Sequence, residues 1–135
     1  MSAANMFSDT NILIYAYSTT ELTKKTVATE VLKHPLHISI QVINEFHWVM
    51  HHKYHVSFEQ LHTINRAFFT LYHVQQIGQA TIELAFTIAQ RYKYQYWDSL
   101  IIAAALEAEC SILYSEDLQH GQTIEQRLTI MNPFM

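Results

Sequence analysis

Short apolar runs alternate with longer amphipathic stretches along the whole chain, a pattern typical of strands separated by helices. The runs that predict strands are Met6–Ser8, Leu36–Ile40, Leu71–Ile77, Ser111–Tyr114 and Leu128–Met131. Strands separated by helices pair in parallel, because a tight hairpin cannot join them. The pattern therefore predicts an α/β fold, a three-layer α/β/α sandwich with a central parallel sheet of four to five short strands.

Helical periodicity covers the stretches between these runs. Ser39 and Ser57 are suitable N-caps for the helices that follow them, and Pro35 stops the helix before it. The last helix has almost no polar face, so we expect it to lie at the centre of the fold. The predicted helices are Asn11–Tyr17, Glu21–His34, Gln41–His52, Phe58–Phe69, one from Gly78 through Arg91, and Trp97–Glu109.

Length and composition indicate one domain over residues 1–135, since 135 residues with 50% hydrophobic content can bury a core without cross-links. The single cysteine, Cys110, excludes an intramolecular disulfide and is interpreted as a small buried hydrophobe. Neither a signal peptide nor a membrane-spanning run is visible, so we expect a cytoplasmic location. The net charge of −4 argues against a general nucleic-acid binder, although a bound metal would reverse the local sign.

The chain's only aspartates, Asp9, Asp98 and Asp117, each stand beside an apolar run. Carboxylates near a core are costly unless they are paired or bind a metal, and oxygen ligands suit a hard cation such as Mg²⁺. Asp9 and Asp117 follow predicted strands, so both should lie at the carboxyl edge of the sheet. Asp98 begins a helix and reaches the same edge if that helix runs antiparallel to the strands.

Among the nine glutamates, Glu45 is the one that lies on an apolar helix stripe, beside Val42 and Val49. Such a glutamate is either a satisfied core residue or a ligand of the site.

Several other signals have a simpler interpretation. His47, His51 and His55 recur every fourth residue, a spacing that can bind Zn²⁺ or Ni²⁺, but surface or interface histidines explain them better. Lys24, with Lys25 and Lys33, could contact phosphates, but solvated helix faces are the preferred explanation. The aromatic residues Tyr94, Tyr96 and Trp97 immediately precede Asp98 and could stack on bases.

Four segments, taken in order, resemble the acidic motifs of PIN-domain nucleases, and especially those of VapC-type toxins of bacterial toxin–antitoxin pairs. They are Asp9–Ala16, Ser39–Phe46, Trp97–Ala104 and Tyr114–Leu118, which together extend over nearly the whole chain. The resemblance implies a metal-dependent endoribonuclease that hydrolyses RNA phosphodiesters with Mg²⁺ or Mn²⁺. It also implies a cognate antitoxin protein and a homodimer, and the apolar residues of Phe58–Tyr72 are candidates for the contact surface.

Carried onto this chain, the resemblance makes Asp9, Glu45, Asp98 and Asp117 the catalytic and metal-binding cluster. Asn11 and Ser115 match supporting polar positions. Gln119 and His120 stand where some family members carry a further acid, which leaves the number of metal ions open. Three alternatives remain: a housekeeping PIN ribonuclease without an antitoxin, a receiver-like signalling domain, and a catalytically inactive interaction domain.

Overall fold

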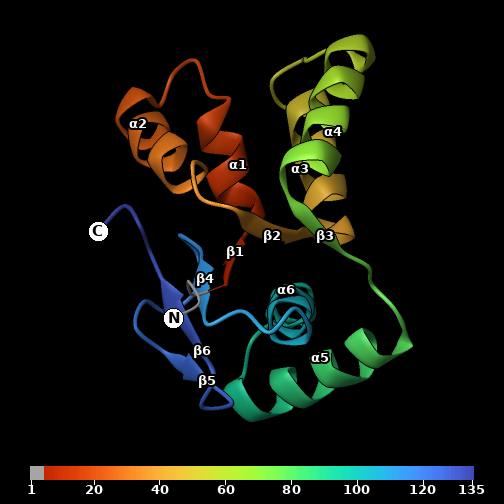
Figure 1. Ribbon diagram of the computed structural model, residues 1–135, viewed down its shortest axis with the longest axis vertical. Helices are drawn as coiled ribbons and strands as arrows, with labels where there is room; N and C mark the ends of the chain where they lie inside the picture. Colours follow the sequence, from red (N-terminus) through yellow and green to blue (C-terminus); the bar gives the residue numbers. More distant parts are fainter. Residues whose placement is uncertain (1–4) are drawn as a thin grey trace.

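The computed structural model describes residues 5–135. Its strands form one mixed sheet, and its helices lie on both sides of that sheet (Figure 1). The strands are β1 (Met6–Ser8), β2 (Leu36–Ser39), β3 (His73–Gln75), β4 (Ile112–Tyr114), β5 (Thr123–Ile124) and β6 (Leu128–Met131). The helices are α1 (Thr10–Ala16), α2 (Leu22–Val31), α3 (Ile40–His52), α4 (Phe58–Leu71), α5 (Gln79–Tyr92) and α6 (Tyr96–Glu107). No helix in this range has both the length and the apolar character needed to cross a membrane.

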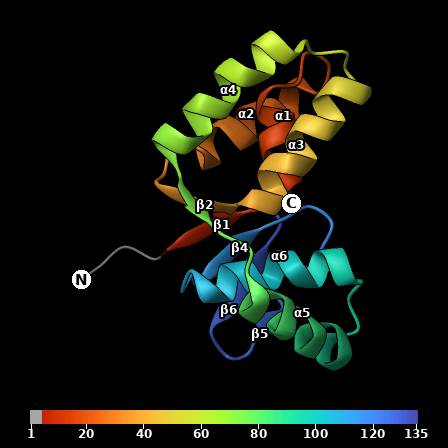
Figure 2. The same ribbon diagram turned by 90° about the vertical axis from the view of Figure 1, so that its right-hand side faces the viewer.

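The strand order in the sheet is β3-β2-β1-β4-β6-β5, and every pairing is parallel except that of β5 with β6. From β1 the chain moves outward to β2 and β3, and then returns to place β4 on the other side of β1. Right-handed crossovers made in opposite directions put their helices on opposite faces. Accordingly, α1 to α4 lie on one side of the sheet and α5 and α6 on the other (Figures 1 and 2). The predicted three-layer sandwich is confirmed.

The sheet has one strand more than the four to five that the sequence predicts. The additional strand, β5, contains two residues and pairs antiparallel with β6, with Ile124 opposite Leu128. Two residues are too few to show alternation, so only the pairing with β6 defines this strand. The predicted strand Leu71–Ile77 is shorter in the structure, because α4 continues through Leu71.

Local capping signals in the sequence correspond to real helix starts. The hydroxyl of Ser39 accepts a hydrogen bond from the backbone N–H of Val42, and Ser57 forms a reciprocal capping box with Gln60. The predicted helix over Glu21–His34 is longer than the observed α2, which ends at Val31; Pro35 disfavours helical backbone at His34, the last residue of the predicted range.

The apolar helix α6 lies at the centre of the molecule, as its composition predicts. Its residues from Ser99 to Leu106 are all buried, and Cys110 just beyond it is only 3% exposed. The aromatic rings of Phe46 and Phe68 join α3 to α4 within the same core, with ring centroids 4.9 Å apart.

Several turns use left-handed backbone at residues other than glycine. Lys93 ends α5 with a φ of 65°, and Glu109 follows α6 with a φ of 58°. The other such residues in the described part of the chain are His55, Glu125 and Gln126. Left-handed backbone costs an L-residue with a side chain roughly 1–2 kcal/mol.

Candidate acidic active site

The strand order reverses between β1 and β4, and this reversal defines where a site can form. In parallel sheets, connections leave such a point in opposite directions and open a crevice beyond the carboxyl ends of the strands. Asp9 directly follows β1, and Asp117 lies in the loop after β4. The backbone N–H of Asp9 donates to the carbonyl of Tyr114 at 2.9 Å, which ties the two strand ends together.

A cavity of about 190 Å³ lies at this point, and all four predicted acids line it. Asp9 comes from the N-cap of α1, Glu45 from the second turn of α3, Asp98 from the first turn of α6 and Asp117 from the β4 loop. The structure therefore brings together side chains that are up to 108 residues apart in the sequence. We call this space the acidic cavity.

Asp9 is the most buried of the four carboxylates, with only 8% of its surface exposed. Its Oδ1 accepts from the backbone N–H of Thr10 at 2.7 Å, and its Oδ2 accepts from the hydroxyl of Ser115 at 2.8 Å. Burial raises the pKa of Asp9 from its ordinary 3.8 to about 6, although both hydrogen bonds lower it; the charges of Glu45 and Asp117 raise it further. An ionised Asp9 is thus costly at neutral pH.

Glu45 and Asp98 experience the same combination of burial and repulsion. Partial burial is the main cause that raises the pKa of Glu45, and the charge of Asp98 adds to it. Partial burial likewise raises the pKa of Asp98, with the charge of Asp117 as the second cause. The salt bridges within residues 5–135 join Lys24 to Glu116, Lys33 to Glu30 and Arg91 to Glu125, so none neutralises a carboxylate of the acidic cavity.

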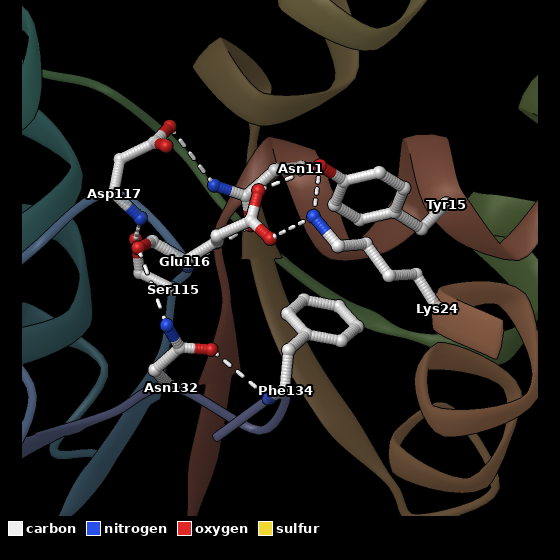
Figure 3. A network of polar contacts seen from close by, with 8 residues as sticks. All are labelled: Asn11, Tyr15, Lys24, Ser115, Glu116, Asp117, Asn132 and Phe134. Carbon is white, nitrogen blue, oxygen red and sulfur yellow. Dashed lines mark hydrogen bonds and ion pairs between the residues drawn. The ribbon is translucent and has the colours of Figure 1, made fainter. Parts of the chain in front are cut away.

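Two polar side chains arrange the β4 loop around the cavity (Figure 3). Besides donating to Asp9, the buried hydroxyl of Ser115 accepts from the backbone N–H groups of Asp117 and Leu118 at 3.2 and 3.4 Å. The amide of Asn11 donates to Asp117 Oδ2 at 3.1 Å and accepts from the backbone N–H of Glu116. Both side chains therefore hold the loop that carries Asp117 against α1.

The same loop is held from its other side by Glu116, which the sequence did not single out. Its carboxylate forms an ion pair with Lys24 of α2 and accepts from the Tyr15 hydroxyl at 2.6 Å (Figure 3). The ammonium of Lys24 also lies 4.7 Å from the centroid of the Tyr15 ring. Lys24 is therefore not simply solvated. It is also not free to bind a phosphate, because its ammonium forms an ion pair with the carboxylate of Glu116. No local pattern could show this, since the partners are 92 residues apart.

The donor set of the cavity suits a hard divalent cation, because it consists of carboxylate oxygens without a basic partner. As placed, however, no three His, Cys, Asp or Glu side chains among the described residues converge closely enough to hold a metal ion. Binding would therefore require side-chain rotation, which is open to Glu45 and Asp117 because both are exposed. The chemistry of the residues present therefore fits such a cation, provided that these side chains rotate toward it.

The histidines of α3 have hydrogen-bond partners of their own. His47 shares a hydrogen bond of 2.9 Å with Asn65, His51 with the carbonyl of Val56, and His52 with the carbonyl of Trp48. None of them belongs to a group of three His, Cys, Asp or Glu side chains placed to hold a metal ion within residues 5–135.

Several solved structures share this fold along most of their length. A toxin–antitoxin complex from Klebsiella pneumoniae matches with a TM-score of 0.70 and 24% identity, over 96% of this chain and 98% of the other. VapC20 from Mycobacterium tuberculosis, described as a Sarcin-Ricin loop cleaving toxin, matches with a TM-score of 0.62 and 14% identity, over 81% and 87%. VapBC2 from Rickettsia felis, bound to a DNA fragment from its promoter, gives 0.66 and 17%, over 94% and 97%.

The sequence was also compared with curated proteins and with models of protein families. The comparison with curated proteins found no significant match. The model of the PIN domain matches residues 6–123, a range that begins at β1, ends at the start of β5 and includes all four acids of the cavity. The chain therefore belongs to the PIN domain family.

Proposed function

We propose that this protein is a divalent-metal-dependent endoribonuclease and the toxin of a VapC-type toxin–antitoxin pair. The observation that carries the proposal is the acidic cavity, where four carboxylates without a basic partner face one another at the switch point of a PIN domain. Burial and mutual repulsion raise the pKa values of Asp9, Glu45 and Asp98, so the cluster is unfavourable when it is ionised and holds no cation. A cation with oxygen ligands would relieve this repulsion, and an anionic phosphate could then approach.

Asp9 and Asp98 would hold Mg²⁺ or Mn²⁺ directly, and Glu45 and Asp117 would complete the shell. A divalent ion bound there would make water more acidic and offset the charge that develops on a phosphodiester. Ser115 orients Asp9 through its 2.8 Å hydrogen bond, and Asn11 orients Asp117 at 3.1 Å. Ser115 therefore sets the position of the Asp9 carboxylate before substrate arrives, and Asn11 holds the loop that carries Asp117 close to it.

The toxin assignment is supported by the structures that share the fold. Two are described as complexes of a toxin with its antitoxin or of VapBC proteins, and one as a toxin that cleaves the Sarcin-Ricin loop. We extend the RNA substrate, the antitoxin and the homodimer to this chain as parts of the proposal. On α4, Phe58, Phe69 and Leu71 are 72%, 50% and 63% exposed, which supports this helix as a contact surface for the antitoxin.

The receiver-like alternative is not supported by the topology. Receiver domains have the strand order 2-1-3-4-5, whereas this sheet follows 3-2-1-4-6-5. The inactive-domain alternative is tested by the experiment below.

Incubation of the purified protein with total RNA, with EDTA, Mg²⁺ or Mn²⁺, tests the chemistry. We expect cleavage only with metal, and mapping the RNA ends would identify the site. The Asp98→Asn variant should lose cleavage and keep its fold, while Glu83→Gln, which removes an exposed acid on α5 outside the cavity, should retain it. Full cleavage by a folded Asp98→Asn protein, free of contaminating nuclease, would refute the proposed site.

Controlled expression in growing bacteria tests the toxin assignment separately. The wild-type protein should arrest growth and the Asp98→Asn variant should not. Co-expression of a small protein encoded next to this gene should restore growth. If the wild-type protein cleaves RNA in vitro but never slows growth, the housekeeping ribonuclease becomes the better description.

A further inference from the structure

A second, larger cavity opens beside the acidic cavity. It has a volume of about 830 Å³ and lies between α3 and the start of α6. Its lining includes Gln41, Asn44, Trp48 and Leu100, and it shares Glu45, Val49 and Trp97 with the acidic cavity. The two cavities therefore form one continuous trough. We call the larger part the tryptophan groove.

Two exposed tryptophans give this groove its character. Trp48 on α3 and Trp97 on α6 are each 64% exposed, although indole rings usually bury most of their surface. The ring of Trp48 is stacked on His52 with centroids 3.6 Å apart, which restricts its orientation. No lysine or arginine lines the groove, so its walls suit flat aromatic groups better than phosphates.

Gln41 adds a polar group at the wall of the groove. Its side-chain N–H donates to the carbonyl of Trp97 at 3.0 Å, which fixes the orientation of the amide. The side chain is only 8% exposed, and its Oε1 is itself buried and has no hydrogen-bond partner within residues 5–135, so a donor can reach it only after the amide turns toward the groove. An amide oxygen can only accept a hydrogen bond, so the unused capacity calls for a ligand that donates one.

We propose that the tryptophan groove is a nucleobase subsite, which binds a base of the RNA next to the phosphate in the acidic cavity. The base stacks on Trp97, the aromatic residue common to both cavities, and an N–H on its edge donates to Gln41 Oε1 once the Gln41 amide has turned toward the groove. This inference rests on the proposed ribonuclease function and specifies where that function gains selectivity among RNA sequences. Each RNA base carries an exocyclic amino group or a ring N–H that can donate to this acceptor, so the position of that donor relative to the stacked ring decides which base is preferred.

The observations favour RNA over a second copy of the chain in this groove. A protein seated there would contact Glu45 and Trp97, which are also walls of the acidic cavity, and would narrow access to it. RNA held at the acidic cavity must instead continue along an adjoining surface, and the groove is continuous with that cavity.

The chain offers a direct probe, because its only two tryptophans both line the groove. Free nucleosides (adenosine, guanosine, cytidine and uridine) are titrated into the metal-free protein while tryptophan fluorescence is recorded. Nucleosides carry no phosphate, so this binding is independent of the acidic cavity. We expect saturable quenching, strongest for the preferred base, that persists in Trp48→Phe and weakens about fivefold in Gln41→Met. Linear quenching, as for free tryptophan, would overturn the proposal.

RNA cleavage provides the second readout. Trp97→Ala, which removes the stacking ring, should raise KM for RNA about fivefold or more and alter the preferred cleavage sites, while Phe86→Ala, which removes an exposed ring that lines neither cavity, should match wild type. Normal cleavage without saturable quenching refutes the subsite alone. Saturable quenching without any cleavage refutes the proposed hydrolysis and leaves the base-binding groove. If Trp97→Ala instead dissociates a dimer and nucleosides do not bind, the groove is an interface between copies.

Discussion

Replacing Asp9 by asparagine should stabilise the metal-free protein at neutral pH, and the gain should depend on pH. Burial raises the pKa of Asp9 from 3.8 to about 6, so the folded chain holds this proton more tightly than the unfolded chain does. Stability from the protonated group is therefore present at low pH and is lost as the pH rises from about 4 to about 6 and beyond. Since one pKa unit corresponds to about 1.4 kcal/mol, the total loss is about 3 kcal/mol.

The Asp9→Asn side chain keeps the carbonyl oxygen that accepts from Thr10, so the start of α1 is preserved. It carries no charge, and it therefore avoids the cost of ionisation. Its contact with Ser115 changes, because a carboxylate oxygen that accepts from the hydroxyl is replaced by an amide group, at a cost of about 1 kcal/mol that does not vary with pH. The change with pH is thus the quantity that reports on Asp9.

Urea unfolding in EDTA measures this quantity when wild type and variant are compared at several pH values. The stability of Asp9→Asn relative to wild type should increase by about 2.5 kcal/mol between about pH 4 and pH 7.5, or by about 8 °C in Tm. The exposed-acid variant Glu83→Gln should show no such trend. A difference that stays within about 0.5 kcal/mol across this range would show that the pKa of Asp9 is not raised.

Other predictions follow from the same contacts. Ser115→Ala removes a donor to a carboxylate and an acceptor for two backbone N–H groups, so it should cost about 2–3 kcal/mol in urea unfolding and weaken Mg²⁺ binding in calorimetry; an unchanged protein would contradict this. Lys24→Met removes the ion pair that holds Glu116 in the β4 loop, so RNA cleavage should slow severalfold, whereas the control Lys25→Met should leave the rate unchanged. Equal rates for the two variants would show that Lys24 does not position the β4 loop. Cys110 is buried and burial raises its pKa to about 12, so mass spectrometry should find no alkylation by iodoacetamide until the protein unfolds.

The parts of the fold that depend on local signals could be predicted from the sequence. The strand Leu128–Met131 has the predicted bounds, Met6–Ser8 is part of a strand as expected, and Ser39 and Ser57 cap helices. Asp9 could be found because it stands where an apolar run ends. In a parallel sheet this position lies at the carboxyl edge of the strands, where sites form. For Glu45 the apolar stripe left two interpretations open, and only the family resemblance favoured the acidic cluster.

The contacts that depend on tertiary structure were not predictable in this way. Lys24 and Glu116 are on segments that look solvated in isolation, and their pairing requires α2 to pack beside the β4 loop. Likewise, Gln41 meets the backbone of Trp97 only when α3 and α6 converge from opposite sides of the sheet. The strand β5 is defined by its partner rather than by its own two residues.

The left-handed backbone at Lys93 and Glu109 means that the thermal stability of this protein can be raised by substitution with glycine. Glycine adopts such backbone without the steric penalty that a side chain incurs, and both positions lie just past the end of a helix, where glycine is common. Neither residue lines the acidic cavity or the tryptophan groove. Lys93→Gly and Glu109→Gly should therefore raise the midpoint of thermal unfolding without altering RNA cleavage. The stabilised protein would allow destabilising active-site variants to be purified in folded form.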